Sequence, residues 1–359
     1  MQQNAIFALF LYCRPGFEAE CSAEIQQRAG NLDIPGYCKA KPDSGYVVFH
    51  CCEAEQPARL VSEIDFSSLI FIRQWFCVLS MRNDLPVTDR VSSLLESLSG
   101  LPGAVHKIFL ETPDTNEGKQ LQALCRAISK PFGLALQKTK YWNGNSTDYR
   151  LHICFLSTSA AYIGYVPDAN SSSWPMGIVR LRFPSSAPSR STLKLEEALY
   201  VFLDDDEREK IMHAGQTAVD LGAAPGGWTW QLVRRSLHVI AVDNGAMDEQ
   251  LMSSGMVEHL RVDGFRYQPS SRHDWMVCDM VEQPMRIAEL VSRWLVNNWC
   301  RNCIFNLKLP MKKRYQEVQR CLDRVREQLD SAGIRYNMQA KQLYHDREEI
   351  TVMILVHGN

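Results

Sequence analysis

The stretch DLGAAPGGWTW, residues 220–230, joins an apolar run to a segment with helical periodicity. Residues 217–222 predict a strand, and residues 228–235 predict a helix. Glycines in a strand-to-helix turn indicate that the backbone comes close to another group, because any Cβ there would collide with it. In an α/β sheet such a turn lies beyond the carboxyl end of its strand, where ligands bind. The stretch therefore predicts a ligand site in an α/β domain.

The sequence after this turn alternates between short apolar runs and helical stretches. Further strands are predicted at residues 237–243, 275–279, 303–309 and 350–356. Pro284 opens one predicted helix, and another with an apolar face ends at Gly333. Alternation of this kind predicts a doubly wound parallel sheet between residue 191 and the end of the chain.

The N-terminal half predicts smaller α+β units. Residues 6–13 and 45–50 predict strands on either side of a helix at residues 18–29, and strands are also predicted at residues 151–156 and 161–166. Thr115 is the predicted N-cap of a helix whose apolar face carries Leu121, Leu124, Cys125 and Ile128. Residues 167–190 are rich in Ser and Pro and predict a linker. The predicted domains are therefore residues 1–55, 56–166 and 191–359.

The composition narrows the kind of protein. The 359 residues contain 39 Lys and Arg against 41 Asp and Glu, so any site for a polyanion has to be a local patch. Cys300 and Cys303 lack the second ligand pair that a zinc site needs, so no metal is predicted. No stretch reads as a signal peptide or reaches the roughly 18 apolar residues of a membrane span. We expect a cytoplasmic protein with no membrane contact.

Two aspartates after the turn indicate what kind of ligand binds. The turn lacks G-x-G-x-x-G, so a nicotinamide dinucleotide is a poor match. Asp243 ends the next predicted strand about 20 residues later, where a carboxylate can accept ribose hydroxyls. Asp263 ends a further predicted strand, where it could accept from an adenine amino group. Each aspartate alone is also typical of a cap or turn, but together with the Gly-Gly turn they favour a nucleoside.

Several longer motifs follow in order along the C-terminal half. They are DLGAAPGGW, CDM at residues 278–280, NLKLP at residues 306–310 and REEIT at residues 347–351. Together they resemble the motifs of S-adenosylmethionine-dependent RNA ribose 2′-O-methyltransferases of the FtsJ type. Four other stretches further resemble the bacterial family of ribosomal RNA large subunit methyltransferase M. They are CRPGFEAEC, SSLIFIRQW, PSRSTLKLEEA and LYHDREE. The resemblance implies a Rossmann-like methyltransferase domain preceded by an α+β RNA-binding region, ferredoxin-like and then THUMP-type.

The resemblance also implies site residues, a cofactor and a partner. Its catalytic tetrad matches Lys194, Asp279, Lys308 and Glu349. The implied cofactor is S-adenosyl-L-methionine, and the implied partner is 23S ribosomal RNA or its precursor, methylated on a cytidine ribose in the peptidyl-transferase loop. We expect the chain to act as a monomer. The residues assigned to the cofactor are Ser191, Asp220, Gly222, Ala224, Pro225, Gly226, Gly227, Trp228, Asp243, Asp263 and Asp279.

The implied role of Lys308 is to accept a proton. A ribose 2′-hydroxyl is a weak acid and a poor nucleophile, so the protein must align it with the methyl group and remove its proton. Lys308 interrupts an apolar strand, so its ammonium should face a polar cleft. It must be neutral to accept a proton, and we expect nearby Lys194 to lower its pKa. Asp279 is expected to orient the amine of Lys308, and Glu349 to anchor Lys194.

Other interpretations stay open at this point. Amino-group methylation of a base would require an Asn/Asp-Pro-Pro-Tyr-like loop, which CDMVEQP does not resemble, whereas methylation at pyrimidine carbon 5 would use a nucleophilic cysteine such as Cys278. A non-catalytic RNA-binding assembly factor is a third possibility, against which the complete tetrad argues. The basic run at residues 311–314 indicates either a solvated face or phosphate contact.

Overall fold

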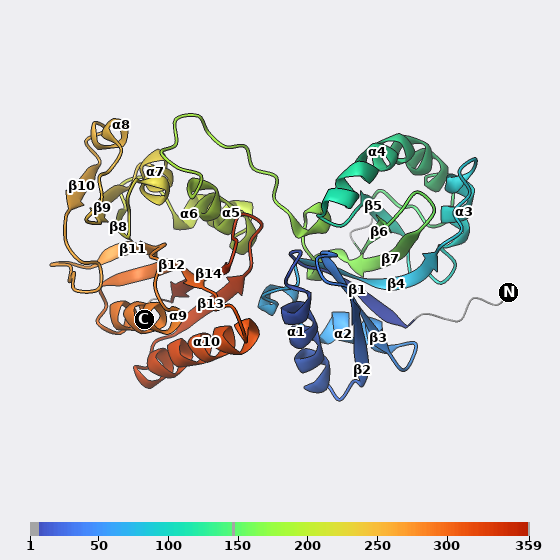
Figure 1. Cartoon of the computed structure of the whole chain (residues 1–359), viewed down its shortest axis with the longest axis horizontal. Coiled ribbons are helices and arrows are strands. Elements are labelled where there is room, and N and C mark those ends of the chain that lie inside the picture. The colour runs from blue at the N-terminus through green and yellow to red at the C-terminus, as the bar shows by residue number, and fades with distance from the viewer. Residues whose placement is uncertain (1–6, 146–147, 358–359) are drawn as a thin grey trace. The chain divides into compact units, whose positions relative to one another are not determined.

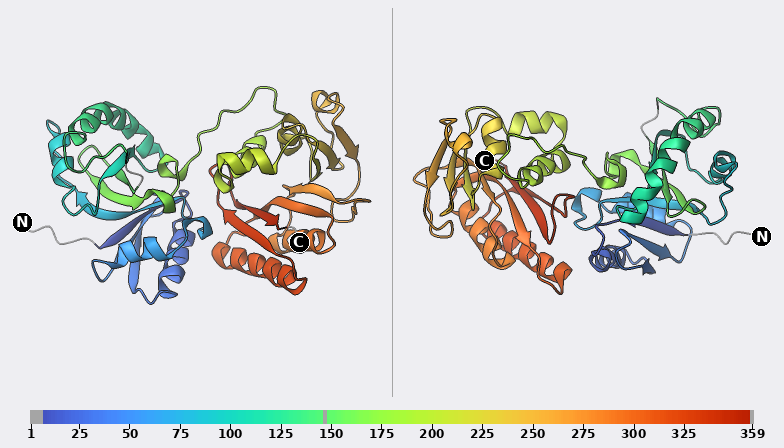
Figure 2. Two further views of the ribbon diagram at one scale, coloured as in Figure 1. Left: turned by 180° about the vertical axis from the view of Figure 1, so that it is seen from behind. Right: turned by 45° about the horizontal axis from the view of Figure 1, so that its top comes forward.

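The computed structural model describes residues 7–145 and 148–357 (Figure 1). The chain forms two compact units, Met1–Ile178 and Val179–Asn359. Each unit is built around one seven-stranded sheet with helices packed against it (Figure 2). The division between the units falls inside residues 167–190.

The sheet of the first unit has the strand order β2-β3-β1-β4-β7-β6-β5. Its strands are β1 (Ala8–Tyr12), β2 (Gly36–Ala40), β3 (Tyr46–Cys51), β4 (Gln74–Arg82), β5 (Val105–Glu111), β6 (Tyr149–Phe155) and β7 (Ala161–Pro167). Neighbouring strands are antiparallel except for β5 and β6. Because β4 pairs with β1 on one side and β7 on the other, one sheet runs through both predicted N-terminal domains. The boundary between residues 55 and 56 stays a prediction.

The sequence predicts two of the helices that the first unit contains, at residues 18–29 and after Thr115. The helices of this unit are α1 (Glu18–Gly30), α2 (Gln56–Glu63), α3 (Arg90–Glu96) and α4 (Asn116–Leu136), with short 3-10 turns at η1 (Phe66–Ser68), η2 (Asp168–Asn170) and η3 (Pro175–Gly177). The Thr115 side chain accepts a hydrogen bond from the Gly118 amide at 3.0 Å, which confirms the predicted N-cap of α4. Cys125, Ile128 and Phe132 of α4 are buried against the sheet.

The second unit contains the sheet predicted around the glycine turn. Its order is β10-β9-β8-β11-β12-β14-β13. The strands are β8 (Thr217–Leu221), β9 (His238–Val242), β10 (Val257–Leu260), β11 (His273–Cys278), β12 (Cys300–Lys308), β13 (Tyr336–Lys341) and β14 (Glu349–Val356). The five strands from β10 to β12 are mutually parallel, but β14 runs antiparallel to both neighbours. The prediction of a wholly parallel sheet is therefore wrong at this edge, because β13 and β14 form a hairpin instead of a helical crossover.

Six helices pack with this sheet in the described part of the second unit. They are α5 (Thr192–Phe202), α6 (Asp205–Ile211), α7 (Gly227–Arg234), α8 (Glu249–Met252), α9 (Pro284–Val296) and α10 (Arg314–Ser331). The core joins Leu199 of α5, Trp228 of α7 and Trp275 of β11. This packing holds the start of α5 next to the turn that follows β8. Within the described residues, no helix combines the length and apolar character needed to cross a membrane.

Candidate active site

A cavity of about 390 Å³ lies where β8, β9 and β11 end. Parallel strands present their carboxyl ends at one edge of the sheet, so the residues that follow these strands meet there. Five residues predicted to bind the cofactor line the cavity, namely Gly222, Ala224, Asp243, Asp263 and Asp279. The rest of its lining consists of Val242, Asn244, Val262, Gly264, Phe265, Met280, Val281 and Glu282.

Two aspartates present carboxylates to this cavity. Asp243 directly follows β9, and its two oxygens accept hydrogen bonds from the amides of Ala224 at 3.0 Å and Gly245 at 2.7 Å. Asp263 accepts from the Phe265 amide at 2.8 Å and is more exposed than Asp243. A carboxylate has about four acceptor positions, so both side chains retain capacity for a ligand. The sequence predicted that Asp263 is the last residue of its strand, but β10 ends at Leu260 and Asp263 lies beyond it.

The two glycines at the start of α7 are required by contacts inside the protein. Gly226 has a φ of +117°, and a Cβ there would lie 2.5 Å from Leu251 Cδ2. A Cβ on Gly227 would overlap Ser191 Oγ and lie 3.1 Å from the Thr192 amide nitrogen. The close approach predicted for this turn is therefore, at these positions, an approach of α7 to α5 and Leu251. Gly222, earlier in the turn, does line the cavity.

The remaining residues predicted for the cofactor lie beside the cavity lining. Asp220 is buried and accepts a hydrogen bond from the Thr229 hydroxyl at 2.6 Å, and its burial raises its pKa to about 7. Trp228 is 2% exposed and belongs to the core, which excludes its ring from stacking on a ligand. Ser191 Oγ lies 2.7 Å from Ser189 Oγ. Pro225, Gly226 and Gly227 are also outside the lining.

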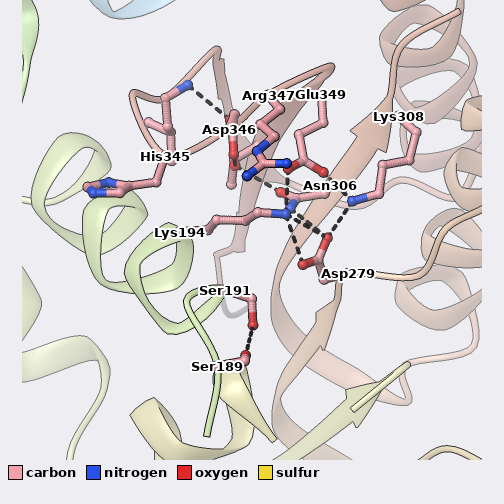
Figure 3. Close-up of polar contacts among 12 residues, drawn as sticks. Ser189, Ser191, Lys194, Asp279, Asn306, Lys308, His345, Asp346, Arg347 and Glu349 are labelled. Carbon is pink, nitrogen blue, oxygen red and sulfur yellow. Dashed lines mark hydrogen bonds and ion pairs between the residues drawn. The ribbon is translucent and has the colours of Figure 1, made fainter. Parts of the chain in front are cut away.

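The four residues of the implied tetrad meet in one cluster (Figure 3). Lys194 lies in the first turn of α5, Asp279 directly follows β11, and Lys308 and Glu349 face each other across β12 and β14. Lys194 Nζ is 3.1 Å from Asp279 Oδ2, and Lys308 Nζ is 2.6 Å from Asp279 Oδ1. Both ammonium groups also contact Glu349. Lys308 is the last residue of β12, so it lies at the strand end and not inside the strand as predicted.

The charges around Lys308 differ from the prediction. Burial alone would lower its pKa, but the carboxylates of Asp279 and Glu349 raise it above its ordinary value. Burial acts to raise the pKa of Asp279, but Lys308 and Lys194 outweigh it and lower that pKa. The expectation that Lys194 would lower the pKa of Lys308 is therefore wrong for this arrangement, because two carboxylates contact the Lys308 ammonium directly.

Three further polar residues support the cluster and were missed from the sequence. Asn306, Thr351 and Asp346 are each 0% exposed. The Asn306 amide donates to Asp279 Oδ1 at 2.9 Å, and Thr351 Oγ1 lies 2.8 Å from Asn306 Oδ1. The sequence signal for Asn306 and Thr351 is that each is a polar residue in an apolar strand, β12 or β14, whereas Asp346 lies in the loop before β14. That signal does not show that positions 45 residues apart are paired.

The cysteines that suggested other chemistry are buried. Cys278 is 0% exposed, and burial raises its pKa to about 12. Cys300 and Cys303 both lie in β12 and are also buried, with raised pKa values. Among the residues that the structure describes, no group of three or more His, Cys, Asp or Glu side chains is arranged to hold a metal.

The basic run after β12 lies at the start of α10. Met311, Lys312 and Lys313 are exposed, Met311 to 93%. Arg314 instead pairs with Glu348 at 2.6 Å. Two of the three basic side chains of the run are therefore open to solvent next to the strand that carries Lys308, where phosphate contact stays a prediction.

Comparisons with known proteins point to one family of methyltransferases. Residues 6–76 match the RlmM ferredoxin-like domain, residues 89–167 match ribosomal RNA large subunit methyltransferase M, N-terminal, and residues 187–322 match FtsJ-like methyltransferase. The chain is 52% identical over 343 residues to the ribosomal RNA large subunit methyltransferase M of Cellvibrio japonicus, covering 96% of this chain and 97% of that protein. It is 47% identical over 359 residues to the protein of the same name from Psychromonas ingrahamii, covering 99% and 98%. The second unit is thus a Rossmann-like, S-adenosylmethionine-dependent methyltransferase domain, and the chain belongs to the ribosomal RNA large subunit methyltransferase M family.

Proposed function

We propose that this chain transfers a methyl group from S-adenosylmethionine to the 2′-hydroxyl of a ribose in 23S ribosomal RNA, with Lys308 as the proton acceptor. The observation that carries the proposal is the cluster of two lysines and two carboxylates joined through Asp279 to the cavity. The names of the relatives support the RNA substrate. The finer target, a cytidine in the peptidyl-transferase loop, rests on the motif resemblance.

The cavity suits S-adenosylmethionine in size and chemistry. Its volume of about 390 Å³ falls in the range of roughly 300–1,000 Å³ that is usual for small-molecule sites. Asp243 would accept the ribose hydroxyls and Asp263 the adenine amino group, while Asp279 borders the end that faces the tetrad. When bound, the cofactor supplies a methyl group that its sulfonium charge has already activated.

The tetrad residues divide the remaining work. Lys308 lies within hydrogen-bond reach of Asp279, which borders the cavity, so the neutral amine, once its own proton has passed to solvent, can take the proton from the incoming hydroxyl. Asp279 holds both ammonium groups and fixes where Lys308 points. Lys194, held by Asp279 and Glu349, provides a fixed positive charge that stabilises the developing alkoxide.

The competing functions have less support. A carbon-5 methyltransferase needs an accessible thiolate, whereas Cys278 is buried and its pKa is raised to about 12. A binding factor without turnover would have no use for two lysines held against two carboxylates beside a cofactor cavity. The intact cluster therefore favours ribose methylation.

The test is methyl transfer with product identification. Purified protein is incubated with cofactor labelled in its methyl group and deproteinised 23S ribosomal RNA from cells that lack this gene, and the RNA is then digested to nucleosides. The proposal predicts label in a single 2′-O-methylnucleoside. Label in a methylated base would support the second function, and cofactor binding without any transfer would support the third.

A further inference from the structure

A chain of buried polar side chains continues from Asp279, and Figure 3 labels Asp279, Asn306 and Asp346 of this chain. It runs from Asp346 through Thr351 and Asn306 to Asp279. Thr351 Oγ1 lies 3.2 and 3.1 Å from the two Asp346 oxygens. Asp346 also accepts a hydrogen bond from the Leu343 amide through Oδ2, at 2.9 Å. None of the first three residues is part of the tetrad or lines the cavity.

The direction of the hydrogen bonds in this chain follows from what each group can donate. Asp279 is held by two ammonium groups and can only accept, so the part of Asn306 that faces it must be the NH₂ group. The carbonyl oxygen of Asn306 must then face Thr351. A carbonyl oxygen also can only accept, so Thr351 must donate its hydroxyl hydrogen to Asn306.

This assignment leaves no hydrogen on Thr351 for Asp346. A threonine hydroxyl has one hydrogen, which the bond to Asn306 uses. The lone pairs of Thr351 Oγ1 therefore point towards the two Asp346 oxygens. If Asp346 were ionised, two acceptors would face each other inside the core with no hydrogen between them, which a buried site does not tolerate.

We propose that Asp346 is a neutral carboxylic acid whose O–H group donates a hydrogen bond to Thr351 Oγ1. Through Thr351 and Asn306 it holds Asp279 in position between Lys194 and Lys308. Asp346 is thus a positioning residue, and its role in methyl transfer rests on the proposed function. The free oxygen, Oδ1, carries the proton, because Oδ2 already accepts from the Leu343 amide.

The surroundings of Asp346 favour the neutral form. Burial raises its pKa well above the usual value, and the nearby carboxylates of Glu349 and Glu197 add to this, while Lys194 acts in the opposite direction. Glu197 is itself held by the amides of Tyr344 and His345 and by His345 Nδ1, so its carboxylate stays close to Asp346. The only other polar partner recorded for Asp346 in the described structure is the Leu343 amide.

Two uncharged substitutions with as many side-chain heavy atoms as aspartate test whether Asp346 acts as a neutral hydrogen-bond donor. Asp346→Asn keeps a neutral donor for Thr351 and an acceptor for Leu343, so it should retain kcat within about threefold of wild type. Asp346→Leu removes both groups and should lower kcat by about tenfold or more, with the cofactor Kd unchanged. Thr351→Val removes the hydroxyl and should lower kcat as Asp346→Leu does. Thr351→Ser keeps the hydroxyl and should retain the wild-type kcat. A tenfold loss of kcat in Asp346→Asn would overturn the proposal.

The stability of the full chain provides a test that needs no RNA. A carboxyl whose folded pKa is raised takes up a proton on folding at any pH between its unfolded and folded pKa values, so wild-type stability falls as pH rises through that range. Asp346→Asn removes this dependence. In urea unfolding, Asp346→Asn should therefore become more stable relative to wild type as pH rises above the unfolded pKa of about 4, by up to about tenfold in folding equilibrium constant per pH unit until the folded pKa is reached.

The two arms separate the possible failures. An Asp346→Asn protein that is less stable than wild type by the same amount throughout this pH range would show an ionised, stabilising carboxylate and overturn the proposal. If wild type does not methylate RNA but the unfolding result is as expected, the proposed function fails while the neutral Asp346 stands. If unfolding is as expected and Thr351→Val keeps full kcat, the positioning role is overturned.

Discussion

Lys308 decides the pH dependence of the proposed reaction. The carboxylates of Asp279 and Glu349 outweigh burial and raise its pKa, so the amine is charged at neutral pH. The neutral fraction then grows about tenfold per pH unit, and kcat/KM should follow with a slope near one between about pH 6.5 and 9. Glu349→Gln removes one of the two carboxylates and should shift this profile to lower pH. A wild-type rate that does not change over this range would contradict Lys308 as the base.

Asp243 is the residue on which the cofactor assignment depends most. Asp243→Asn should weaken cofactor binding by about ten- to a hundredfold, because hydrogen bonds to a charged acceptor contribute about 1.5–3 kcal/mol. Titration calorimetry measures this directly. Asp274→Asn is the matched control. Asp274 accepts a hydrogen bond from the Thr217 amide at 2.9 Å, at the amino-terminal end of β8 and therefore at the end of the strands away from the cavity. If both variants bound S-adenosylmethionine with the same affinity, Asp243 would not be a cofactor-binding residue.

At the level of single residues, the motif resemblance selects four residues that lie in one cluster, but it does not predict the electrostatics of that cluster. Lys308 and Glu349 are 41 residues apart, and their contact depends on the register in which β14 pairs with β12. That register cannot be read from local pattern, so the sequence does not show that Glu349 contacts Lys308, and the predicted direction of the Lys308 pKa shift is wrong. Asn306, Thr351 and Asp346 were missed for the same reason.

Helices with a clear apolar face were predicted well, but several strands were not, among them the central strand β4 and the edge strands β2 and β13. The apolar faces of α9 and α10 are buried, as predicted. By contrast, β2 is largely exposed and β13 mixes polar with apolar residues, so neither shows the alternation that identifies a half-buried strand. Because β13 was missed, the sheet was predicted to be parallel up to its last strand.

The contact between α7 and α5 can be tested at Gly227. Gly227→Ala should destabilise the protein by about 1–3 kcal/mol and slow methyl transfer, because the added Cβ would push against Ser191 and Thr192 at the start of the helix that carries Lys194. Gly133→Ala is the control, since Gly133 lies in α4 with open space around it and should stabilise by about 0.5–1 kcal/mol. Urea unfolding measures both. Stabilisation by Gly227→Ala would contradict the described packing.

At the scale of the whole molecule, we expect the two units to have separate tasks. A fragment beginning at Val179 contains the second sheet, its core and the cavity. It should bind S-adenosylmethionine with the affinity of the full chain but methylate 23S ribosomal RNA at least about a hundredfold more slowly, because the first unit is proposed to bind the RNA. Calorimetry and methyl transfer check the two halves of this prediction. Full methylation by the fragment would show that the first unit is not needed for RNA binding.

The proposed reaction depends on proton transfer to Lys308, and the most direct test of it is the single-turnover rate of methyl transfer by Lys308→Arg. A guanidinium keeps the positive charge and the contacts to carboxylates, but it cannot give up its proton at any working pH. The account predicts that Lys308→Arg is as inactive as Lys308→Ala, about 10²–10⁴-fold below wild type, while both bind the cofactor normally. A Lys308→Arg protein that retains about a tenth of the wild-type rate would show that Lys308 only positions the ribose.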